Sequence, residues 1–245
     1  MSRLGLSVND VSYLCSNVNI LNELDIEVIM SHLSCADDEK SSTNKQQLLL
    51  FNTLVQQLSV ITGPVRLSLA NSAGYLLGSD YHLDIIRSGA SIYGLKVTKS
   101  SKNPMQRVVH LFAQIIQVRN VDHPSTVGYG AIHKINRPTK IATLAIGYAD
   151  GFLRASGQIS NKDTRSFATA FINGKIAPIV GRISMDLITI DVSEIPEAEP
   201  GTYAELIGDN ISIDDLADIS GTIGYEILTR IGQRHHRIYK GLDIK

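Results

Sequence analysis

A tyrosine at the end of an apolar segment is the first residue of this chain whose position suggests chemistry. Tyr148 lies in the stretch IATLAIGYADGFLR, where the apolar residues 141–146 give way to a turn between Gly147 and Gly151. A phenol on such a turn can face a cleft and exchange a proton. A tyrosine corner or a half-buried core ring would place a tyrosine at the same position, so the choice depends on the rest of the chain.

Polar residues also follow three apolar segments in the first part of the chain, where each segment ends. They are His32 after residues 26–31, Asn71 and Ser72 after residues 65–69, and Arg87 with Gly89 and Ala90 at the end of residues 83–87. If these segments are parallel strands, their carboxyl ends meet at one edge of a sheet, where an α/β barrel keeps its active site.

Each of these positions has both a chemical and a structural interpretation. Asn71 and Ser72, in ANSAG, can hold a phosphate at a helix N-terminus or simply cap the helix. Arg87 can contact a ligand or form a salt bridge, and His32 can carry a proton or fill a structural position. In the second part of the chain, Met185 in GRISMD can present a backbone amide to a small substrate or belong to the core.

Composition and charge exclude several classes of protein. The chain has 245 residues, 43% of them hydrophobic, and a formal net charge of −1, so it offers no basic field for nucleic acid. Cys15 and Cys35 are too few for a disulfide framework, and His235-His236 lacks partners at metal-ligand spacing, so we expect no metal. Without a leader-like or membrane-spanning apolar run, the sequence indicates a soluble, cytoplasmic protein with no membrane partner.

Residues 1–96 alternate between helical and strand patterns, which predicts an α/β domain with a parallel sheet. The pattern predicts a helix over residues 7–24 with a capping box from Ser7 and Asp10, and a second helix that ends at Gly63. Only three strands are visible, whereas a closed (β/α)₈ barrel needs eight. We therefore expect a partial barrel that consists of its last three strands.

Residues 97–245 are expected to form an all-β domain with two late helices. Asn173-Gly174 between two strand patterns predicts a type I′ hairpin turn. The helical patterns are at residues 213–219, with Ser212 and Asp215 as a capping box, and at residues 223–231. The expected strands are residues 108–118, 140–146, 167–172, 176–180, 187–192 and 203–207.

Six motifs resemble those of the alanine racemase family, whose members are fold-type III pyridoxal phosphate enzymes. They are ANSAG, RSGASIYG, VGYG, IATLAIGYADGFLR, APIVGRISMD and GTIGYEILTRIG, in the family's order and approximate separations, and MSRLGL with MSHLSCAD resembles the preceding barrel segments. The resemblance implies a barrel followed by a C-terminal β-domain. It also implies a homodimer, with each active site between the barrel of one subunit and the β-domain of the other.

The activity that the resemblance implies is the interconversion of L-alanine and D-alanine, which supplies D-alanine for peptidoglycan precursors. Tyr148 matches the base that exchanges the Cα proton on the L-face of the substrate. A phenol has an ordinary pKa of about 10 and is a weak base at neutral pH. His32 and Arg87 are similar to the residues that support it, and Arg87 also resembles the family's partner for the pyridine nitrogen.

The remaining site residues are also assigned from the resemblance. Ser72, Gly89, Ala90 and Tyr225 match positions that hold the cofactor phosphate, and Asn71 lies in the same cofactor-contact segment. Arg3 and the Met185 amide match contacts to the substrate carboxylate, with Asp186 beside them at the entrance. Ser88 departs from the pattern, since the family usually has proline there, and we expect a slightly looser phosphate loop.

A larger departure is the absence of the family's cofactor lysine, because no segment resembles its VKANAYGHG-like surroundings. Lys40, Lys45 and Lys96 lie in the wrong segments. The chain therefore resembles the C-terminal two thirds of such an enzyme, a truncated form expected to be inactive without the missing N-terminal barrel portion. The alternative is a non-catalytic remnant that only binds cofactor or makes subunit contacts.

Overall fold

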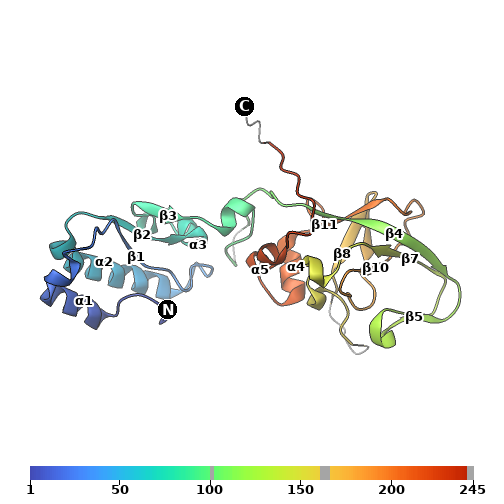
Figure 1. The fold of residues 1–245 in the computed structure, drawn as a ribbon, viewed down its shortest axis with the longest axis horizontal. Coiled ribbons are helices and arrows are strands. Elements are labelled where there is room, and N and C mark those ends of the chain that lie inside the picture. The colour runs from blue at the N-terminus through green and yellow to red at the C-terminus, as the bar shows by residue number, and fades with distance from the viewer. Residues whose placement is uncertain (100–101, 161–165, 242–245) are drawn as a thin grey trace. The chain divides into compact units, whose positions relative to one another are not determined.

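A computed structural model describes residues 1–99, 102–160 and 166–241 (Figure 1). Within it the chain divides into two compact units, Met1–Gln106 and Arg107–Lys245. Each unit has its own sheet and its own buried apolar core.

A three-stranded parallel sheet forms the centre of the first unit. Its strands are β1 (Val28–Met30), β2 (Arg66–Asn71) and β3 (Ile85–Arg87), in the order β1-β2-β3. The sequence predicted all three strands and their parallel arrangement, but β3 begins two residues late. Leu83 has a φ of +50°, which is incompatible with an extended strand.

The first predicted helix is shorter than expected. The helix α1 spans Val8–Ser16, and a separate 3₁₀ turn, η1 (Val18–Leu21), follows it. The predicted capping box is confirmed, because the Ser7 amide donates to Asp10 Oδ2 at 2.7 Å and the Asp10 amide donates to Ser7 Oγ at 3.1 Å. Asn17 has φ −132° and ψ 54°, which ends the helix.

The helix α2 (Ser42–Thr62) lies alongside the strands of this sheet (Figure 1). Phe51 and Leu58 are buried on one side of it. The helix ends at Gly63, also as predicted. The short helix α3 (Ser72–Leu76) begins directly after the last residue of β2.

The second unit is built on a six-stranded antiparallel sheet in the order β10-β7-β4-β11-β8-β9. The strands are β4 (Leu111–Val121), β7 (Thr139–Leu144), β8 (Thr169–Ile172), β9 (Lys175–Pro178), β10 (Ile188–Asp191) and β11 (Tyr203–Ile207). A bridge between Ile179 and Ile190 joins the two ends of this order, so the sheet curls onto itself. Fully buried residues such as Ile115, Leu144 and Leu206 fill its interior.

Turns and short elements complete the second unit. Asn173 and Gly174 join β8 to β9 with φ values of +48° and +84°, as a type I′ turn requires. The helices α4 (Ile213–Ser220) and α5 (Gly224–Arg230) match the predicted late helices. Ser212 caps α4, accepting from the amides of Asp214 and Asp215. A small hairpin of β5 (Ser125–Val127) and β6 (His133–Ile135) was not predicted.

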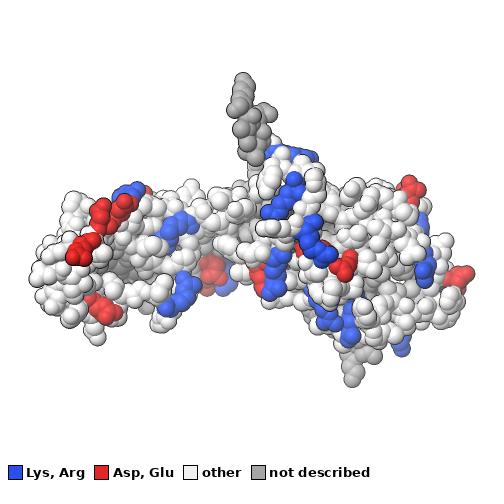
Figure 2. All heavy atoms as spheres, in the orientation of Figure 1, with Lys and Arg blue, Asp and Glu red and all other residues white. Residues whose placement is uncertain are grey.

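The described part of the chain contains no helix that is long and apolar enough to cross a membrane. In the same residues, no group of three or more histidine, cysteine or acidic side chains is arranged to hold a metal ion. Acidic and basic side chains are interspersed on the face that Figure 2 shows.

Candidate active site

The polar residues that the sequence singles out in the first unit lie at the carboxyl ends of its three strands. Asn71 is the last residue of β2 and Arg87 the last of β3, while His32 lies two residues beyond β1. Parallel pairing brings these ends to one edge of the sheet. Contacts of 3.3 Å join His32 to both Asn71 and Arg87.

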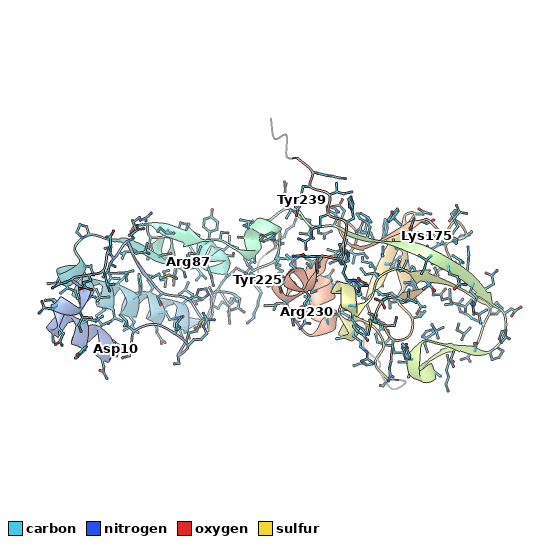
Figure 3. The ribbon with its side chains drawn as sticks, in the orientation of Figure 1. Asp10, Arg87, Lys175, Tyr225, Arg230 and Tyr239 are labelled. Atoms are coloured by element: carbon cyan, nitrogen blue, oxygen red, sulfur yellow. The ribbon has the colours of Figure 1, made fainter. Side chains whose placement is uncertain are left out.

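Arg87, labelled in Figure 3, is held in place by Ser68 within β2 and by Ser31 just after β1. Its Nη1 donates to Ser68 Oγ at 2.5 Å and its Nη2 to the Ser31 carbonyl at 2.6 Å. Ser68 Oγ in turn donates to the Ile85 carbonyl at 2.7 Å. Burial lowers the pKa of Arg87 below its ordinary value, yet the guanidinium stays charged at neutral pH. The guanidinium is therefore a fixed cation at this sheet edge.

The His32 imidazole lies between two hydrogen-bond donors. Arg87 Nη2 is 3.3 Å from Nδ1, and Asn71 Nδ2 is 3.3 Å from Nε2. The orientation of the Asn71 side-chain amide is fixed, because its Oδ1 accepts from the Gly74 amide at 2.8 Å and a flipped amide would lose this hydrogen bond. A neutral imidazole can accept at only one nitrogen, and a protonated one at neither.

The surroundings of His32 favour its neutral form. Burial lowers the pKa of His32 below its ordinary 6.5, and the positive charges of Arg87 and Arg3 lower it further. Because arginine can only donate, the contact with Arg87 requires an Nδ1 without a proton. Arg3 itself is exposed.

A loop after β3 closes around Ser72. Ser72 is buried, and its Oγ accepts from the amides of Gly89 at 2.8 Å and Ser91 at 3.3 Å. Ser88, at the position where proline was expected, bonds through its hydroxyl to Ser91 Oγ at 2.5 Å. Ala90 is buried in the same loop, whereas a Cβ built on Gly89 would meet nothing within 4 Å. The loop therefore leaves open space at Gly89 for an approaching anion.

In the second unit, Tyr148 begins a tight 3₁₀ turn, η5 (Tyr148–Asp150), shortly after β7 ends at Leu144. The turn is closed by the Gly147 amide, which donates to Asp150 Oδ2 at 2.9 Å. The amides of Tyr148 and Ala149 donate to the carbonyls of Ser184 and Met185 at 3.1 and 2.9 Å. The turn that carries Tyr148 is thereby fixed against the segment that carries Met185.

The Tyr148 side chain borders a cavity of about 540 Å³ within the second unit. Tyr148 is 42% exposed, so it is accessible to a ligand. The other lining residues come from the segment after the turn and from α4 and α5: Ala149, Gly151, Leu153, Arg154, Ala155, Ser220, Gly221, Thr222, Glu226 and Arg230. The sequence did not predict this cavity, since its two walls are about 70 residues apart in the chain.

Asp186 and Tyr225, the other residues singled out in the second unit, are both partly exposed. Tyr225 is 43% exposed in the first turn of α5, beside an ion pair of 2.6 Å between Glu226 and Arg230. Asp186 pairs with Arg234 at 3.2 Å. Figure 3 labels Tyr225 and Arg230 on α5.

Three residues that contact the candidate site were missed at the sequence level. Ser31 and Ser68 anchor Arg87, and Arg234 joins Asp186 to Asp150. Two serines among apolar strand residues carry no distinctive pattern. The contacts of Arg234 span 48 residues or more of chain, so no local spacing reveals them.

Family models match both parts of the chain. Residues 1–97 match the family model of the alanine racemase N-terminal domain, and residues 108–239 match that of the alanine racemase C-terminal domain. The second match alone covers more than half of the chain.

Curated relatives and solved structures agree with this assignment. The chain is 44% identical to the alanine racemase of Rickettsia bellii over 242 residues, covering 98% of this chain and 56% of the relative. For the alanine racemase of Rhodospirillum rubrum the identity is 41% over 244 residues, with coverage of 99% and 62%. The chain thus spans about three-fifths of the length of these curated relatives.

The crystal structure of alanine racemase from Bartonella henselae, with covalently bound pyridoxal phosphate, has a TM-score of 0.87 and 36% identity to this chain. The biosynthetic alanine racemase of Pseudomonas aeruginosa has a TM-score of 0.83 and 31% identity. Each match covers 98% of this chain and 64% of the solved chain. The chain belongs to the alanine racemase family.

Proposed function

We propose that this chain provides the catalytic machinery, other than the cofactor lysine, for the interconversion of L-alanine and D-alanine. It would act as a pyridoxal phosphate-dependent isomerase that supplies D-alanine for peptidoglycan precursors in the cytoplasm. Family membership supports the class of reaction. The observation that carries the proposal is the Arg87 guanidinium, anchored by Ser68 and Ser31 at the edge where the strands end.

The residues at this edge fit the cofactor. Arginine has five N–H groups, and the contacts to Ser68, Ser31 and His32 use three of them. The remaining two can serve a ring nitrogen. Ser72 Oγ already accepts two amide bonds, so its hydroxyl proton remains to donate to a phosphate oxygen.

Open space at Gly89 lets a phosphate approach the backbone of Gly89 and Ala90. We assign the cofactor phosphate to Ser72, these two backbone positions and Tyr225, and the pyridine nitrogen to Arg87. Asn71 would act in the same group, since it contacts His32. Tyr225 belongs to the second unit, so this assignment needs both units in one assembly.

Pyridoxal phosphate, when bound, supplies an electron sink that makes the Cα proton of an amino acid removable. Arg87 would donate a hydrogen bond to the ring nitrogen without giving up its proton, because guanidinium remains protonated throughout the accessible pH range. The ring nitrogen would therefore stay unprotonated, and the electron sink would stay weak. A weak sink favours return of a proton to Cα over side reactions.

Tyr148 would move the proton at the Cα of the substrate on its L-face. In a homodimer, the phenol of one subunit would face His32 and Arg87 of the other, and the Arg87 charge would favour the ionised phenolate. Arg3 and the Met185 amide would bind the substrate carboxylate, with Asp186 at the entrance. Fixing both ends of a small amino acid places its Cα beside the base.

Activity would also require the family's cofactor lysine and further barrel strands. No segment of the 245 residues resembles the sequence around that lysine. We propose that residues 1–96 form the last three strands of a (β/α)₈ barrel and that residues 97–245 form the β-domain. The span of about three-fifths of its curated relatives is consistent with this division. On its own, the 245-residue chain is expected to be inactive.

Complementation tests the proposal. The chain is co-expressed with the part of the Rickettsia bellii alanine racemase that it does not span, in a bacterial strain that requires external D-alanine. Growth without D-alanine should need both pieces and should be lost with Tyr148→Phe. Growth supported by the Rickettsia piece alone, or by the pair carrying Tyr148→Phe, would contradict the proposal.

A further inference from the structure

The Arg234 guanidinium links the Tyr148 turn to the Met185–Asp186 segment. The proposed function gives Arg234 no role. Arg234 Nη1 lies 3.2 Å from Asp150 Oδ1, and its Nη2 lies 3.2 Å from Asp186 Oδ1. The Asp150 side chain is only 13% exposed, whereas that of Asp186 is 55% exposed. Arg234 therefore joins a largely buried carboxylate in the Tyr148 turn to an exposed carboxylate next to Met185.

Asp150 connects Arg234 to the turn that carries Tyr148. Its second oxygen, Oδ2, accepts from the Gly147 amide at 2.9 Å and so closes the turn in which Tyr148 lies. His235 adds a second link from the same segment as Arg234, because its Nε2 lies 2.7 Å from the Asp150 carbonyl oxygen. A shift of Asp150 would thus move the backbone on both sides of Tyr148.

The turn has little room to adjust by itself. A Cβ built on Gly147 would lie 2.3 Å from the Met185 carbonyl oxygen, and one built on Gly151 would lie 2.2 Å from the Arg230 carbonyl oxygen. The turn is therefore enclosed by the Met185 segment on one side and by the end of α5 on the other.

The segment that presents Arg234 is itself held in a bend. Arg237 Nη2 donates to the carbonyls of Ile231 and Gly232 at 3.2 and 3.0 Å. These bonds close the chain directly after α5, which directs the segment with Arg234 and His235 back toward the turn.

We infer that Arg234 is a positioning residue, which acts through Asp150 to fix the Tyr148 phenol relative to the Met185 amide and Asp186. Its importance for catalysis rests on the proposed function, since that proposal places Tyr148 and Met185 on the same substrate. The positioning itself is a property of the chain and can be measured without turnover.

The first test uses carbon-13 NMR of ring-labelled tyrosine in the full chain, with the Tyr148 signal identified by its loss in Tyr148→Phe. Arg234→Gln should shift and broaden the Tyr148 signal and leave the other tyrosine signals in place. Arg234→Lys, which keeps the charge, should restore the signal in part. The control, Arg119→Gln, makes the same charge change at an exposed position on β4 and should shift nothing near Tyr148.

Hydrogen exchange gives a second readout on the same samples. In Arg234→Gln, the Tyr148 and Ala149 amides, which bond to Ser184 and Met185, should exchange about three- to fivefold faster, as expected for losing partly exposed ion pairs. Amides of β4 should keep their rates. If Arg234→Gln does not fold, Asp150→Asn takes its place, because it keeps an acceptor for Gly147 while weakening the pair with Arg234.

An unchanged Tyr148 signal and unchanged exchange in the variant that folds would overturn the inference. In the complemented enzyme, Arg234→Gln should lower kcat from L-alanine more than it raises KM, with partial rescue by Arg234→Lys. A change in KM alone, with kcat from L-alanine unchanged, would also count against it. If the complemented enzyme is inactive with wild-type sequence while the NMR and exchange effects appear, the proposed function fails and the positioning role stands.

Discussion

Arg87 Nη2 lies 3.3 Å from His32 Nδ1, and this contact links two of the three polar strand ends of the first unit. Arginine can only donate a hydrogen bond, so the contact forms only when Nδ1 of the imidazole carries no proton. On its other side, His32 meets the amide nitrogen of Asn71, which is also a donor. Protonation of His32 would therefore oppose the folded arrangement.

The first prediction concerns stability against pH. The pKa of His32 is lowered in the folded chain, by burial first and then by Arg87 and Arg3, so the unfolded chain binds the proton more readily. Stability should be unaffected above the ordinary pKa of 6.5 and should fall as the pH drops from there through the lower folded pKa. Urea unfolding followed by circular dichroism, from pH 7.5 to 5, measures the change.

The matched variant for this prediction is His32→Gln, which cannot titrate. Its loss of stability between pH 7.5 and 5 should be smaller than that of the unmodified chain. Identical pH dependence in the two proteins would mean that His32 does not titrate with folding.

The second prediction concerns the anchoring of Arg87. Lysine keeps the charge but cannot reach Ser68 Oγ and the Ser31 carbonyl with a planar fork. Arg87→Lys should lower the free energy of unfolding by about 1–2 kcal/mol, the scale of one or two lost partly buried hydrogen bonds. The control is Arg66→Lys, whose pair with Glu27 is largely exposed and should contribute less than about 0.5 kcal/mol. Equal effects of both substitutions would argue against a fixed Arg87.

The third prediction concerns the fit of the Tyr148 turn. Gly147→Ala places a methyl group where the Met185 carbonyl oxygen lies, 2.3 Å away, so the turn or the Met185 segment must move. Unfolding should become easier by about 2 kcal/mol, as for other overpacked sites. Gly232→Ala is the control, because a Cβ there meets nothing within 4 Å. Comparable melting temperatures for the two variants would contradict the close fit.

The fourth prediction concerns Glu205, a carboxylate that is only 7% exposed in the second unit. It accepts from the amides of Asn210 and Ile211 at 2.7 and 3.0 Å and from Asn210 Nδ2 at 3.0 Å. Burial raises its pKa, but these hydrogen bonds outweigh burial, with a contribution from His110, and the net pKa of Glu205 is lowered.

The stability that Glu205 provides should therefore be present above its ordinary pKa of 4.5 and be lost as the pH falls through the lower folded value. Glu205→Gln should cost about 2 kcal/mol at pH 7 and less at pH 3, as judged by chemical unfolding. Glu199→Gln, an exposed control, should change little at either pH. A cost of Glu205→Gln that is the same at pH 3 and pH 7 would show that the charge is not involved.

Local signals in the sequence were enough to predict much of the fold. The Ser7–Asp10 capping box, the end of α2 at Gly63 and the Asn173-Gly174 turn each depend on a few neighbouring residues, and the structure confirms all three. The small hairpin of β5 and β6 was not predicted, because strands of three residues are too short to show an alternation of apolar and polar residues.

Part of the candidate site could also be predicted from the sequence, and part could not. Parallel strands place His32, Asn71 and Arg87 at one edge, so their proximity follows from the fold. The side chains that orient these residues could not be predicted in this way, since nothing in the sequence distinguishes Ser68 from an ordinary strand residue. Arg234 reaches its partners only through tertiary packing, and neither charge pattern nor spacing predicts such a contact.

The most direct test of the account follows the Cα proton itself. In the complemented enzyme in deuterated water, the rate at which the α-hydrogen of L-alanine is replaced is compared with the rate for D-alanine. Tyr148→Phe should reduce exchange from L-alanine at least about 100-fold, the scale of one lost general base, while exchange from D-alanine largely persists. Undiminished exchange from L-alanine in the variant would contradict the assignment of Tyr148 as the base on that face.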